Sequence, residues 1–306
     1  MRFKFIIFIL SSSLSLYGDQ FAFSFYNDAF VGTDKHFTNA LSFSWINKSY
    51  NNHDDNVQLN SGISLSQTII TPADMTQTEP QYDDMPYAGH LSLDFFLFES
   101  TKESFKEFRV GFGVVGKESG AEFIQKTVHQ MLAVTKPQGW DTQLKTKYTT
   151  NLLLRYGEIT WEDKLYIFNL DWFNHIGLNA GSFITDGFVG TMFRVGYNYR
   201  RNFNLHYPYL KEEASLLKIS KYDKEFGYSL SFGLNSELLL YSYIFDEAKK
   251  EGYQTDKNLI NNSFYLGADL YYLKNKLTLF YRSQSKYTNQ QGDMNRFGGL
   301  LYSYSF

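Results

Sequence analysis

Apolar side chains alternate with small or polar ones from about residue 20 to the end of the chain, and this period of two predicts β-strands. In the first run, Phe21, Phe23 and Phe25 alternate with Ala22, Ser24 and Tyr26. The last run passes through Leu300, Tyr302 and Tyr304 to a terminal Phe306. A soluble sandwich seldom ends on an exposed aromatic ladder, so this ending favours a membrane barrel.

The composition agrees with a barrel that has one apolar face. Aromatic residues make up 19% of the chain, yet the mean hydropathy is only -0.35. A membrane barrel combines these values because its outer face is apolar and its interior is polar. The 29 basic and 32 acidic residues give a net charge of -3, so we expect no nucleic-acid partner. Without cysteine, the chain has neither disulfides nor a thiolate nucleophile.

The N-terminus predicts an export signal. Arg2 and Lys4 precede an apolar run from Phe5 to Leu10, which is too short to span a bilayer as a helix, and a Ser/Leu stretch then ends at Gly18. We therefore expect residues 1–18 to be a signal peptide. Residues 19–306 are then the mature outer-membrane barrel, with its active site at the extracellular rim.

The alternation predicts an all-β fold, a transmembrane antiparallel barrel of about twelve strands with a short extracellular loop helix. The expected strands are 20–27, 37–47, 57–70, 88–99, 104–116, 146–161, 164–181, 187–200, 227–247, 259–274, 276–287 and 293–306. With a periplasmic N-terminus, the loops 28–36, 71–87 and 117–145 face outward. The segment 201–226 is long for a periplasmic connection. We expect a monomer located in the Gram-negative outer membrane.

The loop 117–145 carries a helical pattern. Ser119 and Glu122 have the spacing of a capping box, and Pro137 with Gly139 supplies a stop. The apolar positions of this predicted four-turn amphipathic helix are Ile124, Val128, Met131 and Leu132. Glu122, Gln125 and His129 share another side of it.

Polar residues at the ends of several strands could carry chemistry. They are Asn27 and Asp28, Thr38 with Asn39, Asp83 with Asp84, and His129. Strand parity brings all of them to the extracellular rim. Alone, each has an ordinary interpretation: turn chemistry for the Asn-Asp and Asp-Asp pairs, a strand position for Thr38, and surface or packing for His129. The chain contains no Gly-x-Ser-x-Gly or His-Glu-x-x-His motif.

Short motifs follow one another in a fixed order over residues 21–145. They are Asn27-Asp28-Ala29-Phe30, Thr33-Asp34, Phe37-Thr38-Asn39, Asp84-Met85-Pro86-Tyr87-Ala88-Gly89, His129, and Gly139-Trp140 with Gln143. Together they resemble the outer-membrane lipid A 3′-O-deacylase family. Lys35 and Met85 stand where that family has arginines, Ala40 where it has glycine, and Thr135 where it has an acidic residue.

The resemblance implies a twelve-stranded barrel that removes the 3′-linked acyloxyacyl chain of lipid A, a component of lipopolysaccharide in the outer leaflet. It also implies dependence on Ca²⁺ and a site between the barrel wall and a loop helix. Carried over to this chain, it makes Asn27, Asp28, Thr38 and His129 essential.

These residues allow a concrete expectation for ester hydrolysis. His129 acts as the general base on water, and Asp28 either orients the imidazole or binds the metal. Asn27 and Asp28 offer the oxygen ligands that Ca²⁺ prefers, and Thr38 donates to the oxyanion or holds the water. Two alternatives remain, an outer-membrane phospholipase and a non-enzymatic channel or adhesin.

Overall fold

The computed structural model describes residues 19–31, 37–50, 57–131, 133–199, 203, 206–207, 211–212, 226–289 and 294–306. The expected signal peptide, residues 1–18, lies outside the described residues, and so does most of the segment 201–226. Within that segment, the described residues include a two-stranded pair, β9 (His206–Tyr207) and β10 (Lys211–Glu212).

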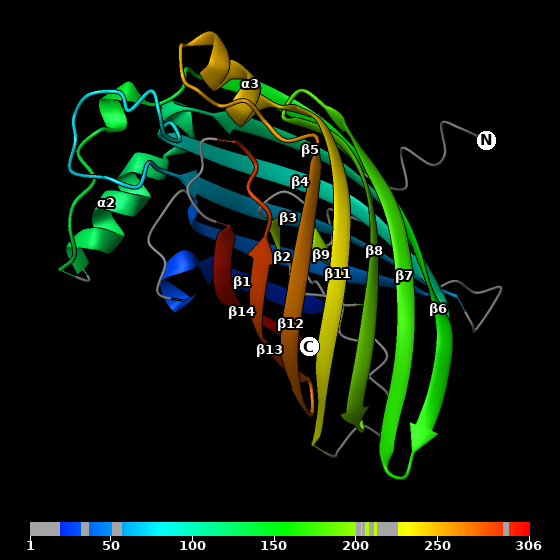
Figure 1. The fold of residues 1–306 in the computed structure, drawn as a ribbon. Coiled ribbons are helices and arrows are strands. Elements are labelled where there is room, and N and C mark those ends of the chain that lie inside the picture. Colours follow the sequence, from blue (N-terminus) through cyan, green and yellow to red (C-terminus); the bar gives the residue numbers. More distant parts are fainter. Residues whose placement is uncertain are drawn as a thin grey trace.

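Twelve antiparallel strands close into one barrel, as the alternation predicted (Figure 1). They are β1 (Gln20–Asn27), β2 (Phe37–Tyr50), β3 (Gln58–Ile70), β4 (Ala88–Ser100), β5 (Ser104–Val115), β6 (Lys147–Leu165), β7 (Phe168–Gly181), β8 (Ile184–Tyr197), β11 (Gly227–Ser242), β12 (Ile260–Tyr272), β13 (Asn275–Gln284) and β14 (Asn295–Ser305). The barrel closes where β1 pairs with β14, from Gln20 opposite Ser305 to Asn27 opposite Gly298. Closure leaves the barrel sheet with no free edge.

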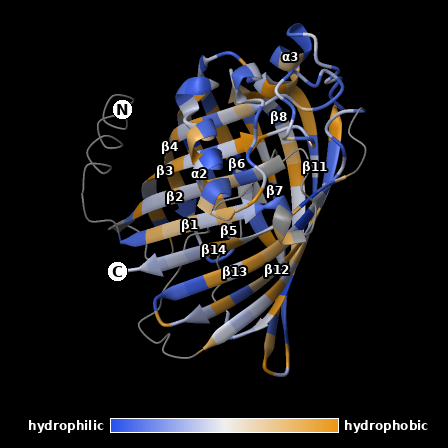
Figure 2. Ribbon diagram, turned by 90° about the vertical axis from the view of Figure 1, so that its left-hand side faces the viewer, coloured by the Kyte–Doolittle hydropathy of each residue, from blue (hydrophilic) through white to orange (hydrophobic). Residues whose placement is uncertain are grey.

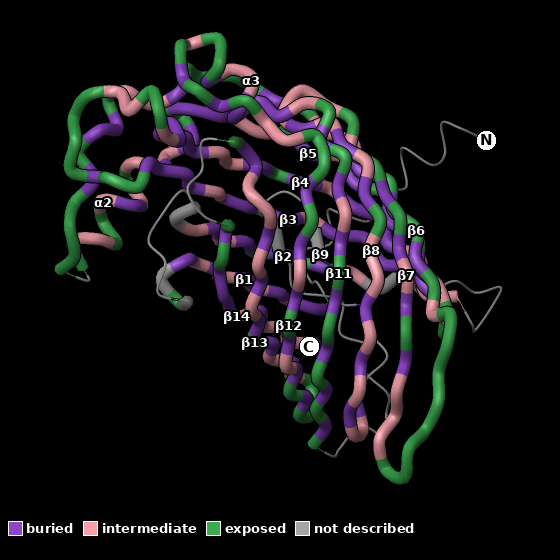
Figure 3. The backbone as a smooth tube through the Cα atoms, viewed as in Figure 1, coloured by how far each residue is buried: buried purple, intermediate pink, exposed green. Residues whose placement is uncertain are grey.

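Each strand presents one face to the lumen and one to the outside. Buried and exposed positions alternate along the strands (Figure 3), and hydropathy alternates with them (Figure 2). On β11, for example, Ser229 and Ser231 are buried, whereas Leu230 and Phe232 are exposed. Because the exposed face is the apolar one, the surroundings of this barrel are lipid.

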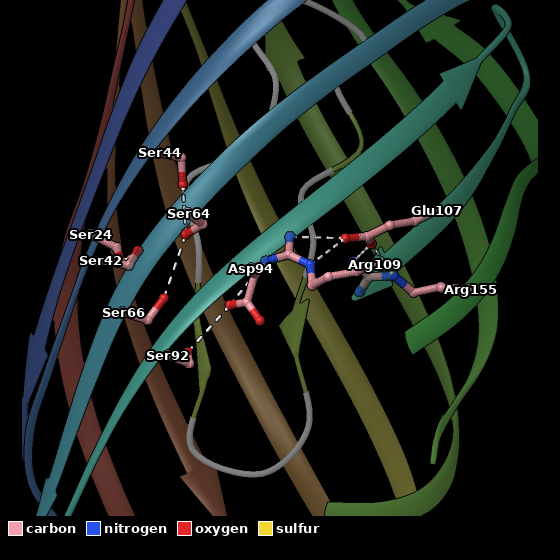
Figure 4. Close-up of polar contacts among 10 residues, drawn as sticks. All are labelled: Ser24, Ser42, Ser44, Ser64, Ser66, Ser92, Asp94, Glu107, Arg109 and Arg155. Carbon is pink, nitrogen blue, oxygen red and sulfur yellow. Dashed lines mark hydrogen bonds and ion pairs between the residues drawn. The ribbon is translucent and has the colours of Figure 1, made fainter. Parts of the chain in front are cut away.

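The lumen is filled with polar and aromatic side chains. Serines form chains of hydrogen bonds across β1 to β3, and Glu107 accepts hydrogen bonds from both Arg109 and Arg155 (Figure 4). Tyr265, Tyr271 and Phe280 point inward and are buried, as expected. Phe203, from the long connection, packs against Phe105 and Phe173 inside the barrel. A filled lumen of this kind is a packed core rather than a wide pore.

The predicted strand 227–247 was wrong at its C-terminal end. β11 ends at Ser242, and the helix α3 (Tyr243–Lys250) follows. The signals for this helix are local: the Ser242 hydroxyl accepts a hydrogen bond from the amide of Phe245, Asp246 lies in the first turn, and Lys249 and Lys250 lie in the last. The strand predicted at 187–200 begins and ends three residues earlier, as β8.

Short helices lie at one end of the barrel, which we call the helical end. The 3-10 helix η1 (Asp28–Val31) follows β1, η2 (Lys117–Ser119) and α2 (Ala121–Met131) follow β5, η3 (Trp140–Thr142) precedes β6, and α3 follows β11 (Figure 1). These positions are at the same end because antiparallel strands alternate in direction. In the described part of the chain, no helix has the length and apolar character needed to cross a bilayer.

Candidate functional site

Asn27, Asp28 and Thr38 come together where β1 and β2 meet at the helical end. Asn27 is the last residue of β1 and pairs with Asn39 on β2. Asp28 begins η1 and is 2% exposed. Thr38 is the extra residue at a register shift between β2 and β3, because Phe37 pairs with Ile70 and Asn39 with Ile69. Such bulges are common beside active sites.

The helix α2 begins against the ends of β3 and β4. The predicted capping box does not form: the Ser119 hydroxyl donates to the carbonyl of Gly116 at 2.6 Å and accepts from the Ala121 amide at 3.4 Å, whereas Glu122 pairs with Lys126 at 2.6 Å. Gly120 has a positive φ of 71° between the two helices, a conformation that glycine adopts without strain.

The buried side of α2 differs from the predicted apolar side. Two of the predicted apolar positions, Val128 and Met131, are exposed, and Met131 is 79% exposed. Ala121 and Gln125 are buried instead, with Ile124 packed against them in part. The helix also has three turns rather than four. The grouping of Glu122, Gln125 and His129 on one side is confirmed, because Gln125 is buried and the other two are half-buried.

A buried amide ties α2 to the neighbouring loops. The Trp140 indole donates to Gln125 Oε1 at 2.8 Å, and Gln125 Nε2 lies 3.7 Å from Met75 Sδ. The Tyr87 ring packs on Trp140, and its hydroxyl donates to the Met75 carbonyl at 3.2 Å. Burial raises the pKa of the Tyr87 phenol, which keeps it a neutral donor. The contacts of Gln125 with Trp140 and Met75 therefore join the loops 71–87 and 117–145. Gln125 lies one helical turn before His129.

The imidazole of His129 is held by its own loop. Its Nδ1 lies 2.5 Å from the carbonyl oxygen of Thr135. A carbonyl can only accept, so Nδ1 carries the proton, and in the neutral ring Nε2 keeps its lone pair. A backbone carbonyl thus orients the His129 imidazole at the position where the resembling family has an acidic residue. The side chain of Thr135 is not needed for this contact.

α2 lies alongside the ends of β2, β3 and β4 in both views (Figures 1 and 2). It contacts β3 and β4. The start of α2 is therefore on the same side of the helical end as Asn27, Asp28 and Thr38, and Ile69 lies between them, because it pairs with Asn39 and packs against Ala121. His129 is on a separate element from that group, eight residues beyond Ala121 along α2.

Asp83 and Asp84 do not join this group. Asp84 accepts hydrogen bonds from the amides of Ala73 at 2.8 Å and Met85 at 2.6 Å, and Asp83 is exposed. This is turn chemistry, in line with the ordinary interpretation of the pair.

Oxygen donors at the end of β1 suit a hard cation. Asp28 is a buried carboxylate beside the amide of Asn27, and buried carboxylates need a counter-charge or hydrogen bonds. No group of three or more His, Cys, Asp or Glu side chains suited to a metal ion occurs in the part of the chain that the structure describes. A metal here would therefore depend on amide and carbonyl oxygens as well as Asp28.

The sequence reasoning missed the contacts that position α2. Gly89 lies directly under the start of the helix, where a Cβ atom would overlap the Ala121 methyl and the Ser119 hydroxyl. Gly139 lies against Tyr87, with a Cβ atom falling 2.5 Å from the ring. Both glycines belong to motifs that the sequence displays, but only the fold reveals what each one approaches.

The closed twelve-stranded barrel, with its apolar outer face and helices gathered at one end, defines the class: an outer-membrane β-barrel. The chain belongs to the family described as "Outer membrane protein LpxR", whose profile matches residues 4–306. It is accordingly an outer-membrane protein.

A solved structure supports the fold. LpxR from Salmonella typhimurium has a TM-score of 0.79 at 16% sequence identity, over 94% of this chain and 100% of that one. The β domain of the Bordetella autotransporter BrkA has a TM-score of 0.47 at 10% identity, over 94% of this chain and 99% of that one. No curated protein sequence matches the chain. The Salmonella structure therefore supports the same barrel fold over nearly the whole chain.

Proposed function

We propose that this protein hydrolyses the ester that joins the 3′-linked acyloxyacyl chain to lipid A in the outer leaflet. Membership in the LpxR family supports a lipid A deacylase role. The orientation of His129 carries the chemical part of the proposal, because its ring offers Nε2 as a base at the helical end. On this proposal the helical end faces outward, where the polar head of lipid A lies.

His129 acts as general base and then as general acid. Nε2 takes a proton from water as the water oxygen adds to the ester carbonyl carbon. The tetrahedral intermediate then breaks its bond to the sugar oxygen, which takes the proton back from Nε2. The products are the free acyloxyacyl acid and a sugar hydroxyl. The Thr135 carbonyl stabilises the imidazolium formed midway, because it accepts from the protonated Nδ1.

Asn27 and Asp28 are the residues proposed to hold Ca²⁺. Since the Thr135 carbonyl already orients His129, we assign Asp28 to the metal rather than to the imidazole. A bound Ca²⁺ supplies positive charge that polarises the ester carbonyl. We assign Thr38 as a donor to the developing oxyanion. Thr38 is the extra residue of the bulge, and it directly precedes Asn39, which pairs with Asn27 across β1 and β2.

The His129→Gln variant tests the base. We expect deacylation to fall about 100-fold or more, since general base catalysis contributes about 10²–10⁴-fold. The readout is the mass spectrum of lipid A from membranes that contain the variant. Gln130→Ala is the matched control, because Gln130 is the exposed neighbour on α2. Normal trimming by His129→Gln contradicts the assignment, and release of fatty acid from phospholipids alone points to a phospholipase.

Calcium removal tests the metal. We expect EDTA to abolish deacylation and added Ca²⁺ to restore it, while Asp28→Asn needs a higher Ca²⁺ concentration or stays inactive. The barrel itself should remain folded, as judged by its heat-dependent mobility in a denaturing gel. Full activity in EDTA would show that no metal takes part.

A further inference from the structure

Four buried oxygen atoms on the lumen face near the helical end have no hydrogen-bond partner apart from a contact between the Asp186 and Glu237 carboxyl groups. They belong to two carboxylates and two amides: Asp186 Oδ2, Glu237 Oε1, Asn261 Oδ1 and Gln284 Oε1. Each of these four side chains is at least 97% buried. Buried polar atoms are nearly always satisfied, so four unsatisfied acceptors at one level of the barrel need an explanation.

The strand register brings these residues together. Glu237 on β11 pairs directly with Asn261 on β12, and side chains in such pairs are about 5 Å apart at Cβ. Asp186 on β8 pairs with Leu239, which makes it the diagonal neighbour of Glu237 on the same face.

Gln284 on β13 is joined to the cluster through a tyrosine. Tyr287 donates its hydroxyl to Glu237 Oε2 at 3.4 Å and accepts a hydrogen bond from Gln284 Nε2. The ring of Tyr287 also packs against Phe245 of α3, at 5.4 Å between centroids. The cluster therefore lies beneath the helix that covers this part of the lumen.

The other polar atoms of these four side chains already take part in hydrogen bonds. Asn261 Nδ2 donates to the carbonyl of Asn258 at 3.0 Å, and Asn179 Nδ2 donates to Asp186 Oδ1 at 2.8 Å. With Gln284 Nε2 bonded to Tyr287, both amides of the cluster have their nitrogen engaged and their oxygen open. The cluster thus presents only acceptors.

The charge of the cluster helps to decide between a proton, a water molecule and a cation as the partner of the four oxygens. Two adjacent buried carboxylates repel each other, and Arg282, which acts electrostatically on Glu237, balances one of them. A proton shared between Asp186 and Glu237, which contact each other, satisfies one oxygen of each and leaves the oxygens of Asn261 and Gln284 to a separate water molecule. A single hard cation can replace both, because Ca²⁺ accepts six to eight oxygen ligands including amide carbonyls.

We propose that Asp186, Glu237, Asn261 and Gln284 bind a Ca²⁺ ion inside the barrel, separate from the site proposed at Asp28. Water can complete the coordination, because a lumen cavity of about 100 Å³ is lined by Asn179 and Ile184, next to Asp186. The ion links β8, β11, β12 and β13 below α3. Its role is structural, since the ion is enclosed within the barrel wall.

Equilibrium dialysis with radioactive calcium tests this site on the full-length barrel, purified in detergent and stripped with a chelator. At a Ca²⁺ concentration too low to load the weakened site of Asp28→Asn, we expect one Ca²⁺ per chain in that background, and none after Glu237→Gln is added. We also expect Ca²⁺ to raise the unfolding temperature of the Asp28→Asn protein, because a ligand that binds only the folded state stabilises it.

Asp269→Asn provides the matched control. Asp269 is also a buried lumen carboxylate, but Ser229, Thr278 and Lys276 already contact it. In the Asp28→Asn background, this variant should still bind one Ca²⁺ per chain. Absence of bound Ca²⁺ in the Asp28→Asn protein overturns the lumen site without any lumen variant, and so does an unchanged count in Glu237→Gln. Loss of deacylase activity on its own does not bear on this proposal.

Discussion

Gly89 marks the place where the barrel wall and α2 come closest. It lies on β4 at the helical end, and a methyl group there would overlap Ala121 and Ser119 at the start of the helix. The helix must give way, because the β4 backbone is fixed by its partners β3 and β5. The position of His129 therefore depends on a residue that never contacts the substrate.

The variant Gly89→Ala should lose deacylation at least about tenfold while the barrel stays folded, because small misplacements of a catalytic group cost large factors in rate. Lipid A mass spectra measure the activity, and heat-dependent mobility measures the fold. Gly187→Ala is the control: it lies on β8, and a Cβ atom there meets nothing within 4 Å. Equal activity of the two variants would show that α2 tolerates displacement.

At the scale of residues, the sequence predicted the placement of the β1 and β2 residues better than the contacts around His129. Asn27, Asp28 and Thr38 were placed together by counting strands, and the register brings their backbones together. The hydrogen bond from His129 to the Thr135 carbonyl could not be predicted, because a backbone acceptor leaves no mark on residue types. The pairing of Gln125 with Trp140 depends on how two loops fold over each other, which alternation does not encode.

At the scale of elements, the loop 71–87 is held by one carboxylate. Asp74 accepts hydrogen bonds from the amide and hydroxyl of Thr76, at 3.0 and 2.6 Å, and from Gln77 at 2.9 Å. These bonds lower the pKa of Asp74 below its usual value of 3.8. A carboxylate with a lowered pKa stabilises the folded loop fully above pH 3.8 and loses this effect as the pH falls through the lowered pKa.

We therefore expect pepsin to cut the loop 71–87 faster below pH 3.8 than at pH 4.5, whereas Asp74→Ala is cut at similar, high rates at both. The cleavage rate of a synthetic peptide of the same sequence corrects for the pH dependence of pepsin. A wild-type loop that resists cleavage equally at both pH values would mean that other contacts, such as those of Asp84, hold it.

Strands were predicted well and helices less well, for a physical reason. A strand repeats every two residues over ten or more positions, so its signal accumulates. α3 has eight residues and directly continues the apolar run of β11, so its Ser242 cap was hidden within a strand pattern. In α2 the predicted apolar positions Val128 and Met131 are exposed, so the apolar spacing does not mark the side of this helix that packs on the barrel.

At the scale of the whole molecule, the barrel encloses charges that only the closed fold can pair. Glu107 and Arg109 come from β5 and Arg155 from β6, and all three side chains are buried in the lumen (Figure 4). Glu107 accepts from Arg109 Nη2 at 2.9 Å and from Arg155 Nη2 at 2.5 Å. The sequence predicted a polar lumen, but not which charges meet inside it, because that depends on register.

The Glu107→Gln variant should destabilise the barrel by about 3–5 kcal/mol, because it leaves two buried guanidinium groups with one carboxylate fewer. Denaturant unfolding in detergent, followed by tryptophan fluorescence, measures the change. Lys106→Gln, which breaks an exposed pair between Lys106 on β5 and Glu99 on β4, should cost only about 0–1 kcal/mol. Deacylation by Glu107→Gln should persist at low temperature, because the network is remote from α2. If both variants unfold at the same denaturant concentration, water in the lumen screens these charges, and the interior is wetter than its packing implies.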